Sequence, residues 1–272
     1  MLRLICQEET TLKEFTENQY AQASFFWNRL LKDREIKVNG KKVGENVVLK
    51  FGDEICYYLT KKQEEKPAFY TVYEDGNVLV VDKESGVNSE AVFSALQRER
   101  ECYFIHRLDR NTSGLMVFAL TKKAEEELLT AFKERWIEKV YHTVCFGSFS
   151  KKTEVLTAYL EKDQGKSLVR VYDNPKVGAE TIITEYEVLN YKDGLTKLKV
   201  VLHTGKTHQI RAHFAHLRKP IVGDMKYGDT LKNKELGLAR QKLVAYSLKF
   251  DHFAYLKELN GKIFYSRFET DI

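Results

Sequence analysis

The alternation of apolar and polar positions near the start of the chain predicts two short helices followed by a small sheet. Apolar residues recur at helical spacing across residues 11–34, with polar residues between them. Asn39-Gly40 then separates two strand-like pieces, and this dipeptide favours a tight hairpin because both turn residues need positive φ. Residues 47–51 and 55–59 continue the alternation, so we expect them to form further strands.

The rest of the pattern predicts a larger unit of mixed helices and strands. Helical periodicity is present at residues 89–100, 122–135 and 207–217. Because helices and strands do not alternate regularly, a doubly wound parallel sheet is not expected. The segments typical of strands are 70–81 around a turn at 74–77, 114–120, 140–146, 153–160, 168–172, 181–189, 196–203 and 243–250.

A charged segment without apolar periodicity separates these two units. It runs Lys61-Lys-Gln-Glu-Glu-Lys-Pro67, and it is the best candidate for a linker. We therefore predict two domains, at residues 1–62 and 63–272.

The composition excludes several classes of protein. The chain is 43% hydrophobic and 31% charged, which is typical of a folded globular protein. Its longest uninterrupted apolar run is Leu115–Leu120, whereas a membrane-spanning helix needs about twenty residues. The N-terminal segment becomes acidic at Glu8 before the apolar core of a signal peptide forms. We expect a cytoplasmic protein that does not associate with membranes.

The four cysteines agree with a reducing compartment. They are far apart in the sequence and include no C-x-x-C pair, so neither a disulfide framework nor a thiolate metal site is predicted. They are Cys6, Cys56, Cys102 and Cys145.

The positive charge is concentrated in one part of the chain. The 44 Lys and Arg residues exceed the 39 Asp and Glu residues by five. Between Lys199 and Lys226, six Lys or Arg residues accompany a single acid, Asp224, together with four of the seven histidines. Such a local basic cluster suits a phosphate-bearing partner, and nucleic acid is the commonest large one.

The segment His106–Gly114 contains a candidate nucleophile. Asp109 lies between Arg107 and Arg110, and opposite charges nearby favour an ionised carboxylate. An ionised carboxylate can act as a nucleophile or as a base. The same charge pattern is also typical of a structural Arg–Asp network at the entrance to a strand, and the pattern alone leaves both interpretations open.

The histidine-rich segment 203–213 predicts an anion site rather than a metal site. Gly205 precedes the predicted helix 207–217, whose first turn offers free backbone N–H groups. His208 and His213 are five residues apart and do not share a helix face, and no HExxH pattern or acidic ligand lies nearby. Side chains that would add donors to the anion site are Lys206, Thr207 and Gln209.

A third segment, Trp136–Val144, offers an aromatic side chain to the same site. Alternation along a strand places Lys139, Tyr141 and Thr143 on one face. A tyrosine in that position can stack on a base or form a hydrogen bond near a nucleophile. Read alone, it is equally typical of a half-buried strand tyrosine.

Taken together and in this order, the segments resemble one family. His106-Arg-Leu-Asp-Arg-Asn-Thr-Ser-Gly-Leu115 resembles the HRLDxxTSGL signature of the RluA/RluD-type pseudouridine synthases. The resemblance covers about residues 68–250. It departs from the family at Glu84, where proline is usual, and at Lys206, where arginine is common. Segments similar to further family motifs are Val72–Gly86, Phe132–Tyr141, Thr204–Arg211 and Pro220–Gly228.

The resemblance implies both a fold and a reaction. The implied fold is α+β, with a mixed, largely antiparallel central sheet, flanking helices and a cleft. The implied reaction converts uridine in RNA to pseudouridine without a cofactor or a metal. Asp109 would attack the nucleoside at the sugar C1′ or at the base, and Arg211 would pair with Asp109. Tyr141 would stack on the base and help to remove the C5 proton. Further contacts implied at the RNA or the site framework are Arg107, which would fill the space of the flipped nucleotide, and Arg110, Lys206, His208 and Ile210.

The first sixty residues resemble the S4 RNA-binding domain that often precedes this catalytic domain. The similarity lies in Ile36–Val43 and Gly52–Ile55, and it implies RNA contacts at Arg29, Arg34, Lys37 and Lys41. We expect a monomer whose partner is structured RNA, with ribosomal RNA (rRNA) favoured over transfer RNA. Two alternatives remain at this point: a non-catalytic RNA-binding protein that retains the fold, and a metal hydrolase that uses the histidines.

Overall fold

The computed structural model describes residues 2–19, 30–57, 69–163, 168–238 and 240–272. The chain divides into two compact units, Met1–Phe69 with Val87–Cys102, and Tyr70–Gly86 with Tyr103–Ile272. The predicted linker 61–67 and the domain boundary beside it lie outside the described residues.

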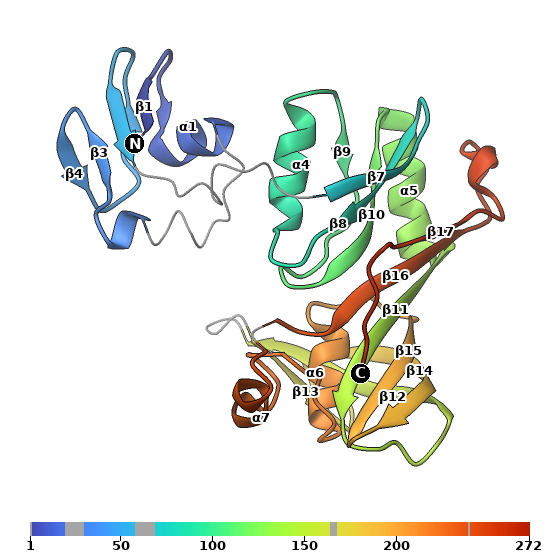
Figure 1. Ribbon diagram of the computed structural model, residues 1–272. Coiled ribbons are helices and arrows are strands. Elements are labelled where there is room, and N and C mark those ends of the chain that lie inside the picture. Colours follow the sequence, from blue (N-terminus) through green and yellow to red (C-terminus); the bar gives the residue numbers. More distant parts are fainter. Residues whose placement is uncertain (1, 20–29, 58–68, 164–167, 239) are drawn as a thin grey trace. The chain divides into compact units, whose positions relative to one another are not determined.

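The first unit contains a four-stranded antiparallel sheet in the order β1-β6-β3-β4 (Figure 1). The predicted hairpin joins two of these strands, and Asn39 and Gly40 have φ angles of 50° and 77° as such a turn requires. The sequence pattern does not predict β1, because four residues are too few to establish an alternation. The strands are β1 (Leu2–Ile5), β3 (Ile36–Val38), β4 (Lys41–Val43) and β6 (Glu54–Tyr57).

The helices of the first unit partly match the prediction. A two-stranded ladder of β2 (Thr10–Thr11) and β5 (Val48–Leu49) leads into α1 (Leu12–Gln19), which matches the first predicted helix. The second predicted helix is described only at residues 30–32, which are helical. Helix α4 (Ser89–Gln97) also belongs to this unit. The buried core includes Leu12, Leu30, Ile36, Leu49, Ile55 and Tyr57.

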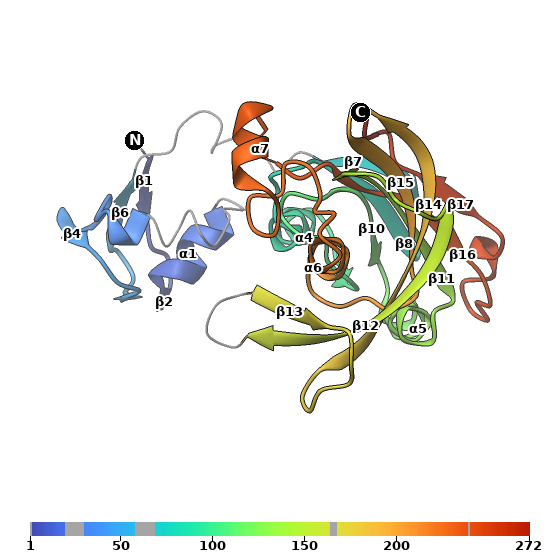
Figure 2. The ribbon, with the colours of Figure 1, turned by 90° about the horizontal axis from the view of Figure 1, so that it is seen from below.

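The second unit is built on an eleven-stranded sheet (Figures 1 and 2). Its main order is β13-β12-β14-β15-β11-β16-β10-β8-β7, with β9 on β10 and β17 on β16. Only the pairing of β10 with β16 is parallel among the described pairings, so the α+β fold with a mixed, largely antiparallel sheet is confirmed. The strands are β7 (Phe69–Glu74), β8 (Val78–Lys83), β9 (Tyr103–Phe104), β10 (Ser113–Ala119), β11 (Ile137–Phe146), β12 (Thr153–Asp163), β13 (Leu168–Tyr172), β14 (Glu180–Lys192), β15 (Leu195–Leu202), β16 (Leu243–Phe250) and β17 (Ile263–Tyr265).

Strand β10 directly follows the segment that contains Asp109, so its position decides where the site lies. All seven of its residues are buried, which explains its continuous apolar sequence. It begins where Gly114 meets the backbone of Ala245 on β16, so closely that a Cβ on residue 114 would lie 2.3 Å from the Ala245 carbonyl oxygen. The predicted signature segment therefore ends at the junction of two strands that are about 130 residues apart in the sequence.

Three helices accompany this sheet. Helix α5 (Lys122–Glu134) starts at Thr121, whose hydroxyl accepts a hydrogen bond from the Ala124 N–H, and it packs its buried residues against β10. Helix α6 (Gln209–His216) packs beside β13 (Figure 2). Helix α7 (Thr230–Glu235) and a short 3-10 helix at Lys257–Leu259 are not anticipated by the sequence pattern.

No helix among the described residues is long and apolar enough to cross a membrane. The four cysteines are buried, and none forms a disulfide.

Candidate active site

Asp109 lies in the loop between β9 and β10, and a buried lysine holds this loop. The Thr112 N–H donates to the Asp109 carbonyl oxygen at 3.0 Å. Lys83, on β8, is completely buried, and its Nζ lies 3.0, 3.3 and 2.5 Å from the carbonyl oxygens of Glu84, Arg110 and Thr112. An ammonium that donates to carbonyls on both sides of a loop restricts its path. Lys83 thereby sets the backbone position of Asp109.

The carboxylate of Asp109 is paired with a residue of α6. Arg211 donates from Nη1 to Asp109 Oδ2 at 2.8 Å. The other side of the same guanidinium donates to Asp224, from Nε to Oδ2 at 2.7 Å and from Nη2 to Oδ1 at 2.9 Å. The side chain of Asp224 is completely buried and also accepts from the N–H groups of Lys226 and Tyr227, at 2.8 and 3.1 Å. Arg211 therefore bridges two carboxylates, one of which is anchored by the following turn.

The charges of this bridge support one another. Burial alone would lower the pKa of Arg211, but hydrogen bonding to Asp224 and the charges of Asp224 and Asp109 raise it above its ordinary value. Burial would likewise raise the pKa of Asp224, and its bonds to Arg211 and to backbone N–H groups lower it instead. The buried pair is thus ionised at neutral pH, with its charges and hydrogen-bonding groups satisfied.

His208 faces the other oxygen of Asp109. Its Nε2 lies 3.8 Å from Asp109 Oδ1, and its Nδ1 lies 2.8 Å from the hydroxyl of Tyr227. Residue 208 adopts a left-handed backbone with φ of 54° immediately before α6, so its side chain leaves the helix axis and enters the pocket. Burial lowers the pKa of His208 to about 4, although the charge of Asp109 acts in the opposite direction. The imidazole is therefore neutral at physiological pH.

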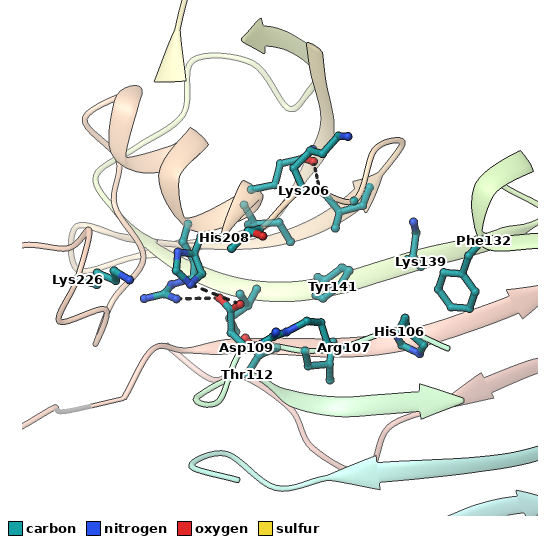
Figure 3. Close-up of a pocket in the computed structure, with 18 of the residues that line it drawn as sticks. His106, Arg107, Asp109, Thr112, Phe132, Lys139, Tyr141, Lys206, His208 and Lys226 are labelled. Atoms are coloured by element: carbon teal, nitrogen blue, oxygen red, sulfur yellow. Dashed lines mark hydrogen bonds and ion pairs between the residues drawn. The ribbon is translucent and has the colours of Figure 1, made fainter. Parts of the chain in front are cut away.

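Tyr141 lines the pocket from β11. Its residue pairs with Val200 on β15 and with Ala245 on β16, next to an irregularity in the β11–β16 register. Burial raises the pKa of the Tyr141 phenol, and the charge of Asp109 raises it further. Tyr141 is therefore a neutral phenol at physiological pH, held on a central strand beside the carboxylate (Figure 3).

These groups surround a pocket of about 610 Å³ (Figure 3). It brings together side chains from the loop before β10, from β11 and from the start of α6, which are distant in the sequence. The predicted site residues that line it are Asp109, Tyr141, Arg211, Arg107, Lys206, His208 and Ile210.

Arg110 is the predicted residue that does not line this pocket. Its Nε donates to the carbonyl oxygen of Gly86 at 2.9 Å, so it belongs to the framework of the loop. This also corrects the argument from charge pattern. The cation that hydrogen-bonds Asp109 is Arg211, more than a hundred positions away, and not Arg110 beside it. The Arg110 side chain is directed to Gly86 and not to Asp109, because the chain turns sharply before β10.

The helix beside the predicted anion site starts later than expected, and the residues proposed as its donors, Lys206, Thr207 and Gln209, line the pocket. The helix begins at Gln209 and not at residue 207, because His208 has a left-handed backbone. Gln209 is buried, and its amide accepts from the Lys206 N–H and donates to the Ile183 carbonyl oxygen, so it is not directed to the pocket as a donor. Lys206 does reach the pocket lining, and its Nζ pairs with Glu180 at 2.5 Å.

Several residues of this site are missing from the sequence-based set. Asp224 and Tyr227 hold Arg211 and His208, and the GDMKYG segment of the family motif is the signal that contained them. Strand alternation already placed Lys139 with Tyr141, and burial lowers the pKa of Lys139. The additional residues that line the pocket include His106, Phe132, Lys139, Lys162 and Lys226.

His106 is held at the far end of the pocket from His208 (Figure 3). Its Nε2 accepts a hydrogen bond from the Val117 N–H at 3.0 Å, and its ring stacks on Phe132 with 4.4 Å between centroids. Burial lowers its pKa to about 3, so it is neutral. Because Nε2 is an acceptor, the proton of this imidazole resides on Nδ1.

The histidines of the segment 203–216 each contact a different partner. His203 meets Glu185, His208 meets Tyr227, His213 meets Thr184 and His216 meets Asp173. In the part of the chain that the structure describes, no three His, Cys, Asp or Glu side chains converge as metal ligands.

The predicted S4-like contacts lie in the first unit. Lys37 on β3 and Lys41 on β4 are exposed on adjacent strands. Arg34 is exposed and has a left-handed backbone, with φ of 52°, just before β3. Arg29 lies outside the described residues.

Comparisons with known proteins show the family of this chain. The family described as RNA pseudouridylate synthase matches residues 65–216. Ribosomal large subunit pseudouridine synthase C of Vibrio parahaemolyticus is 31% identical over 82% of this chain and 79% of its own. An uncharacterised RNA pseudouridine synthase of Aquifex aeolicus is 31% identical over 90% of this chain and 87% of its own.

A solved structure is also similar. The human RNA pseudouridylate synthase domain-containing protein 1 superposes with a TM-score of 0.60 and 26% identity, covering 68% of this chain and 80% of the human chain. The resemblance drawn from the motifs around Asp109, Tyr141 and Arg211 is therefore confirmed at the level of the family. This chain belongs to the RNA pseudouridylate synthase family, and it is an enzyme that isomerises uridine in RNA to pseudouridine.

Proposed function

We propose that Asp109 is the nucleophile of this isomerisation. The proposal rests on the different surroundings of the two carboxylate oxygens of Asp109. Oδ2 is held by Arg211, while Oδ1 faces the pocket and receives no hydrogen bond from the described residues. A carboxylate fixed through one oxygen and open at the other is suited to attack.

The reaction rearranges bonds within one nucleotide. Attack by Asp109 at the sugar C1′ or at the base leads to cleavage of the C1′–N1 bond, and the uracil turns within the site. A C1′–C5 bond then forms, C5 loses its proton, N1 gains one, and the Asp109 carboxylate is released. No electrons are exchanged with another molecule, so the balance requires neither an oxidant nor a reductant.

In this proposal Tyr141 stacks on the uracil. A phenol with a raised pKa keeps its proton at neutral pH, so it is not present as a base that is ready to take the C5 proton. Its neutral ring instead offers an apolar face to the turning base. Arg211 orients Asp109 and places positive charge beside it.

The remaining pocket residues are assigned to the RNA. Arg107 is exposed at the pocket, and we assign it to the space that the flipped nucleotide leaves in the RNA. Extrusion of a nucleotide costs a few kcal/mol, so a side chain that replaces its stacking lowers that cost. Lys206 and His208 would contact the nucleotide, and Ile210 would pack against it.

The substrate we favour is ribosomal RNA. Relatives at 31% identity are named as synthases of the large ribosomal subunit, and the basic segment 199–226 provides the charge for an RNA of that kind. We further propose that an S4-like domain at residues 1–62 assists binding through Arg29, Arg34, Lys37 and Lys41. The protein would act as a cytoplasmic monomer.

The nucleophile is tested with Asp109→Asn and RNA that carries tritium at uridine C5. The wild-type enzyme should release tritium, and the variant should release none, with unchanged circular dichroism and RNA affinity. Asp173→Asn is the matched control, because Asp173 is an exposed carboxylate of the same unit and pairs with His216. Tritium release by Asp109→Asn at the wild-type rate would overturn the assignment.

The substrate is tested by chemical mapping of pseudouridines in RNA from cells with and without the gene. We expect a site in large-subunit rRNA to lose its modification in the deletion strain and to regain it when the wild-type gene is restored. Loss of a tRNA site alone would reject ribosomal RNA as the target while leaving the role of Asp109 intact.

A further inference from the structure

Tyr227 and His208 form a hydrogen-bonded pair beside Asp109. The Tyr227 hydroxyl lies 2.8 Å from His208 Nδ1, and it also accepts a hydrogen bond from the Val169 N–H of β13 at 3.0 Å. The opposite nitrogen of the imidazole, Nε2, lies 3.8 Å from Asp109 Oδ1. A chain of polar groups thus runs from the backbone of β13 to the nucleophilic oxygen.

The phenol hydroxyl of Tyr227 has one proton to donate. One of its acceptor positions is occupied by the Val169 N–H, a group that can only donate. If the phenol donates its own proton to His208 Nδ1, every member of the chain is satisfied. If Nδ1 carried a proton, the Tyr227 hydroxyl would accept two hydrogen bonds, and its own proton would have no acceptor among these groups. Nδ1 is therefore the acceptor.

The opposite nitrogen, Nε2, faces a negative charge. Asp109 is a carboxylate and presents Oδ1 to Nε2. A protonated Nε2 attracts that oxygen, whereas a bare nitrogen lone pair would repel it. The groups that bear on the electrostatics of His208 are Asp109, Asp224, Arg211 and Lys226, and burial keeps the imidazole neutral. Hydrogen bonding at Nδ1 and the charge facing Nε2 both place the single proton on Nε2.

We propose that Tyr227 is a positioning residue that fixes His208 in its Nε2–H tautomer, so that a neutral imidazole presents a donor to Asp109 Oδ1 and to the nucleotide it attacks. This inference rests on Asp109 as the nucleophile. The 3.8 Å separation leaves the Nε2–H unengaged by Oδ1 at hydrogen-bond distance in the RNA-free enzyme. A uridine oxygen that approaches from the pocket can therefore accept from Nε2–H while Oδ1 attacks.

The turn that carries Tyr227 also explains why the arrangement is rigid. Asp224 receives the Tyr227 N–H at 3.1 Å and binds Arg211 through two hydrogen bonds. The guanidinium of Arg211 lies over the Tyr227 ring, 5.2 Å from its centroid. One turn, Asp224–Tyr227, thus orients both the cation on Oδ2 and the neutral donor that faces Oδ1.

The tautomer is tested directly by nuclear magnetic resonance on protein labelled with ¹⁵N-histidine, with His208→Gln used to assign the signals. We expect wild-type His208 to show a protonated Nε2 and a bare Nδ1. His106 is an internal reference for the other tautomer, with its proton on Nδ1, since its Nε2 accepts from the Val117 N–H. In Tyr227→Phe, His208 should shift toward a mixture of tautomers. A wild-type His208 with its proton on Nδ1 would overturn the proposal.

Kinetics test the consequence. Tyr227→Phe should lower kcat about tenfold, which corresponds to one hydrogen bond of about 1.4 kcal/mol, with little change in KM. Tyr172→Phe is the matched control, because it removes a phenol hydroxyl of β13 that bonds Glu161. This control should leave kcat unchanged. An effect of Tyr227→Phe that is confined to KM, or absent, would reject a positioning role.

A double-mutant cycle shows whether Tyr227 acts through His208. The amide nitrogen of a glutamine at position 208 reaches a place similar to that of Nε2, so His208→Gln should keep part of the activity. Adding Tyr227→Phe to His208→Gln should cause no further loss, because no tautomer remains to be fixed. Additive losses would contradict the proposal. The nuclear magnetic resonance result does not depend on turnover, so it stands apart from the test of Asp109 as nucleophile.

Discussion

Arg211 and Asp224 are joined by two hydrogen bonds of 2.7 and 2.9 Å, which leave one guanidinium nitrogen to reach Asp109 at 2.8 Å. The orientation of the cation at the nucleophile is thus decided by a second carboxylate that does not itself line the pocket.

Asp224→Ala should destabilise the enzyme and slow it. Removing one partner of a buried ion pair leaves the other charge uncompensated, at a cost of about 3–5 kcal/mol. Urea unfolding measures the stability, and tritium release from C5 measures the rate. Glu187→Ala is the control, since Glu187 and its partner Lys199 are both half-exposed and 3.8 Å apart, and it should cost less than about 1 kcal/mol. Asp224→Asn keeps the shape of the side chain, and a normal rate in this variant would contradict the positioning of Arg211 by Asp224.

Lys83→Met should loosen the loop that carries Asp109. It leaves the buried Thr112 carbonyl oxygen, and the part-buried ones of Glu84 and Arg110, without this donor, and an unsatisfied buried group costs about 1–3 kcal/mol. We expect lower stability in urea together with faster hydrogen exchange at the Thr112 amide. Lys133→Met on the exposed face of α5 should change stability by no more than about 0.5 kcal/mol. Equal effects of the two variants would show that the loop does not depend on Lys83.

Gly114→Ala should disrupt the junction of β10 and β16. The added Cβ would lie 2.3 Å from the Ala245 carbonyl oxygen, so the two strands would have to separate. Gly237→Ala tests the cost of positive φ alone, because residue 237 has φ of 65° and open space around it, and it should lose about 1–2 kcal/mol. Thermal unfolding should show a much larger loss for Gly114→Ala, and a similar loss would mean that the strands move apart easily.

Stability should decrease as the pH falls from about 6.5 toward 4. Burial lowers the pKa of His208 and of His213 to about 4 in the folded state, while the unfolded histidines have values near 6.5. Between these values the unfolded chain binds more protons, so each histidine removes up to about 1.4 kcal/mol of stability per pH unit as the pH decreases. Urea unfolding at several pH values should show that the free energy of unfolding depends less steeply on pH in His213→Gln than in the wild type. An unchanged slope would mean that His213 is protonated in the folded protein.

Much of the fold follows from local pattern. Seven consecutive buried residues in β10 and the alternation of β14 and β15 are strong signals because each segment packs one face or both faces against an apolar layer. The Asn39-Gly40 turn is equally local, since positive φ is a property of those residues. Strands β1, β9 and β17 are absent from the predicted set; they are two to four residues long, and pairing with a neighbouring strand decides their conformation.

The candidate site was only partly visible in the sequence. The motifs contained Asp109, Tyr141 and Arg211, and they led to the family that the comparisons confirm. The charge pattern alone did not distinguish Arg110, which binds the Gly86 carbonyl oxygen, from Arg211, which binds Asp109 as the family motifs imply. The charge pattern of a sequence reports only which charges are close along the chain, whereas an ion pair depends on distance in space.

The sequence by itself determined the type of most helices and strands, the signature aspartate and the family to which the chain belongs. Tertiary structure decided how Arg211 is oriented at Asp109, which carboxylate oxygen faces the pocket and which nitrogen of His208 carries the proton. These three outcomes depend on Asp224 and Tyr227, whose turn contacts α6 and β13 in the folded structure. Backbone conformation is set largely by neighbours in sequence, but hydrogen bonds between distant side chains exist only in the folded geometry.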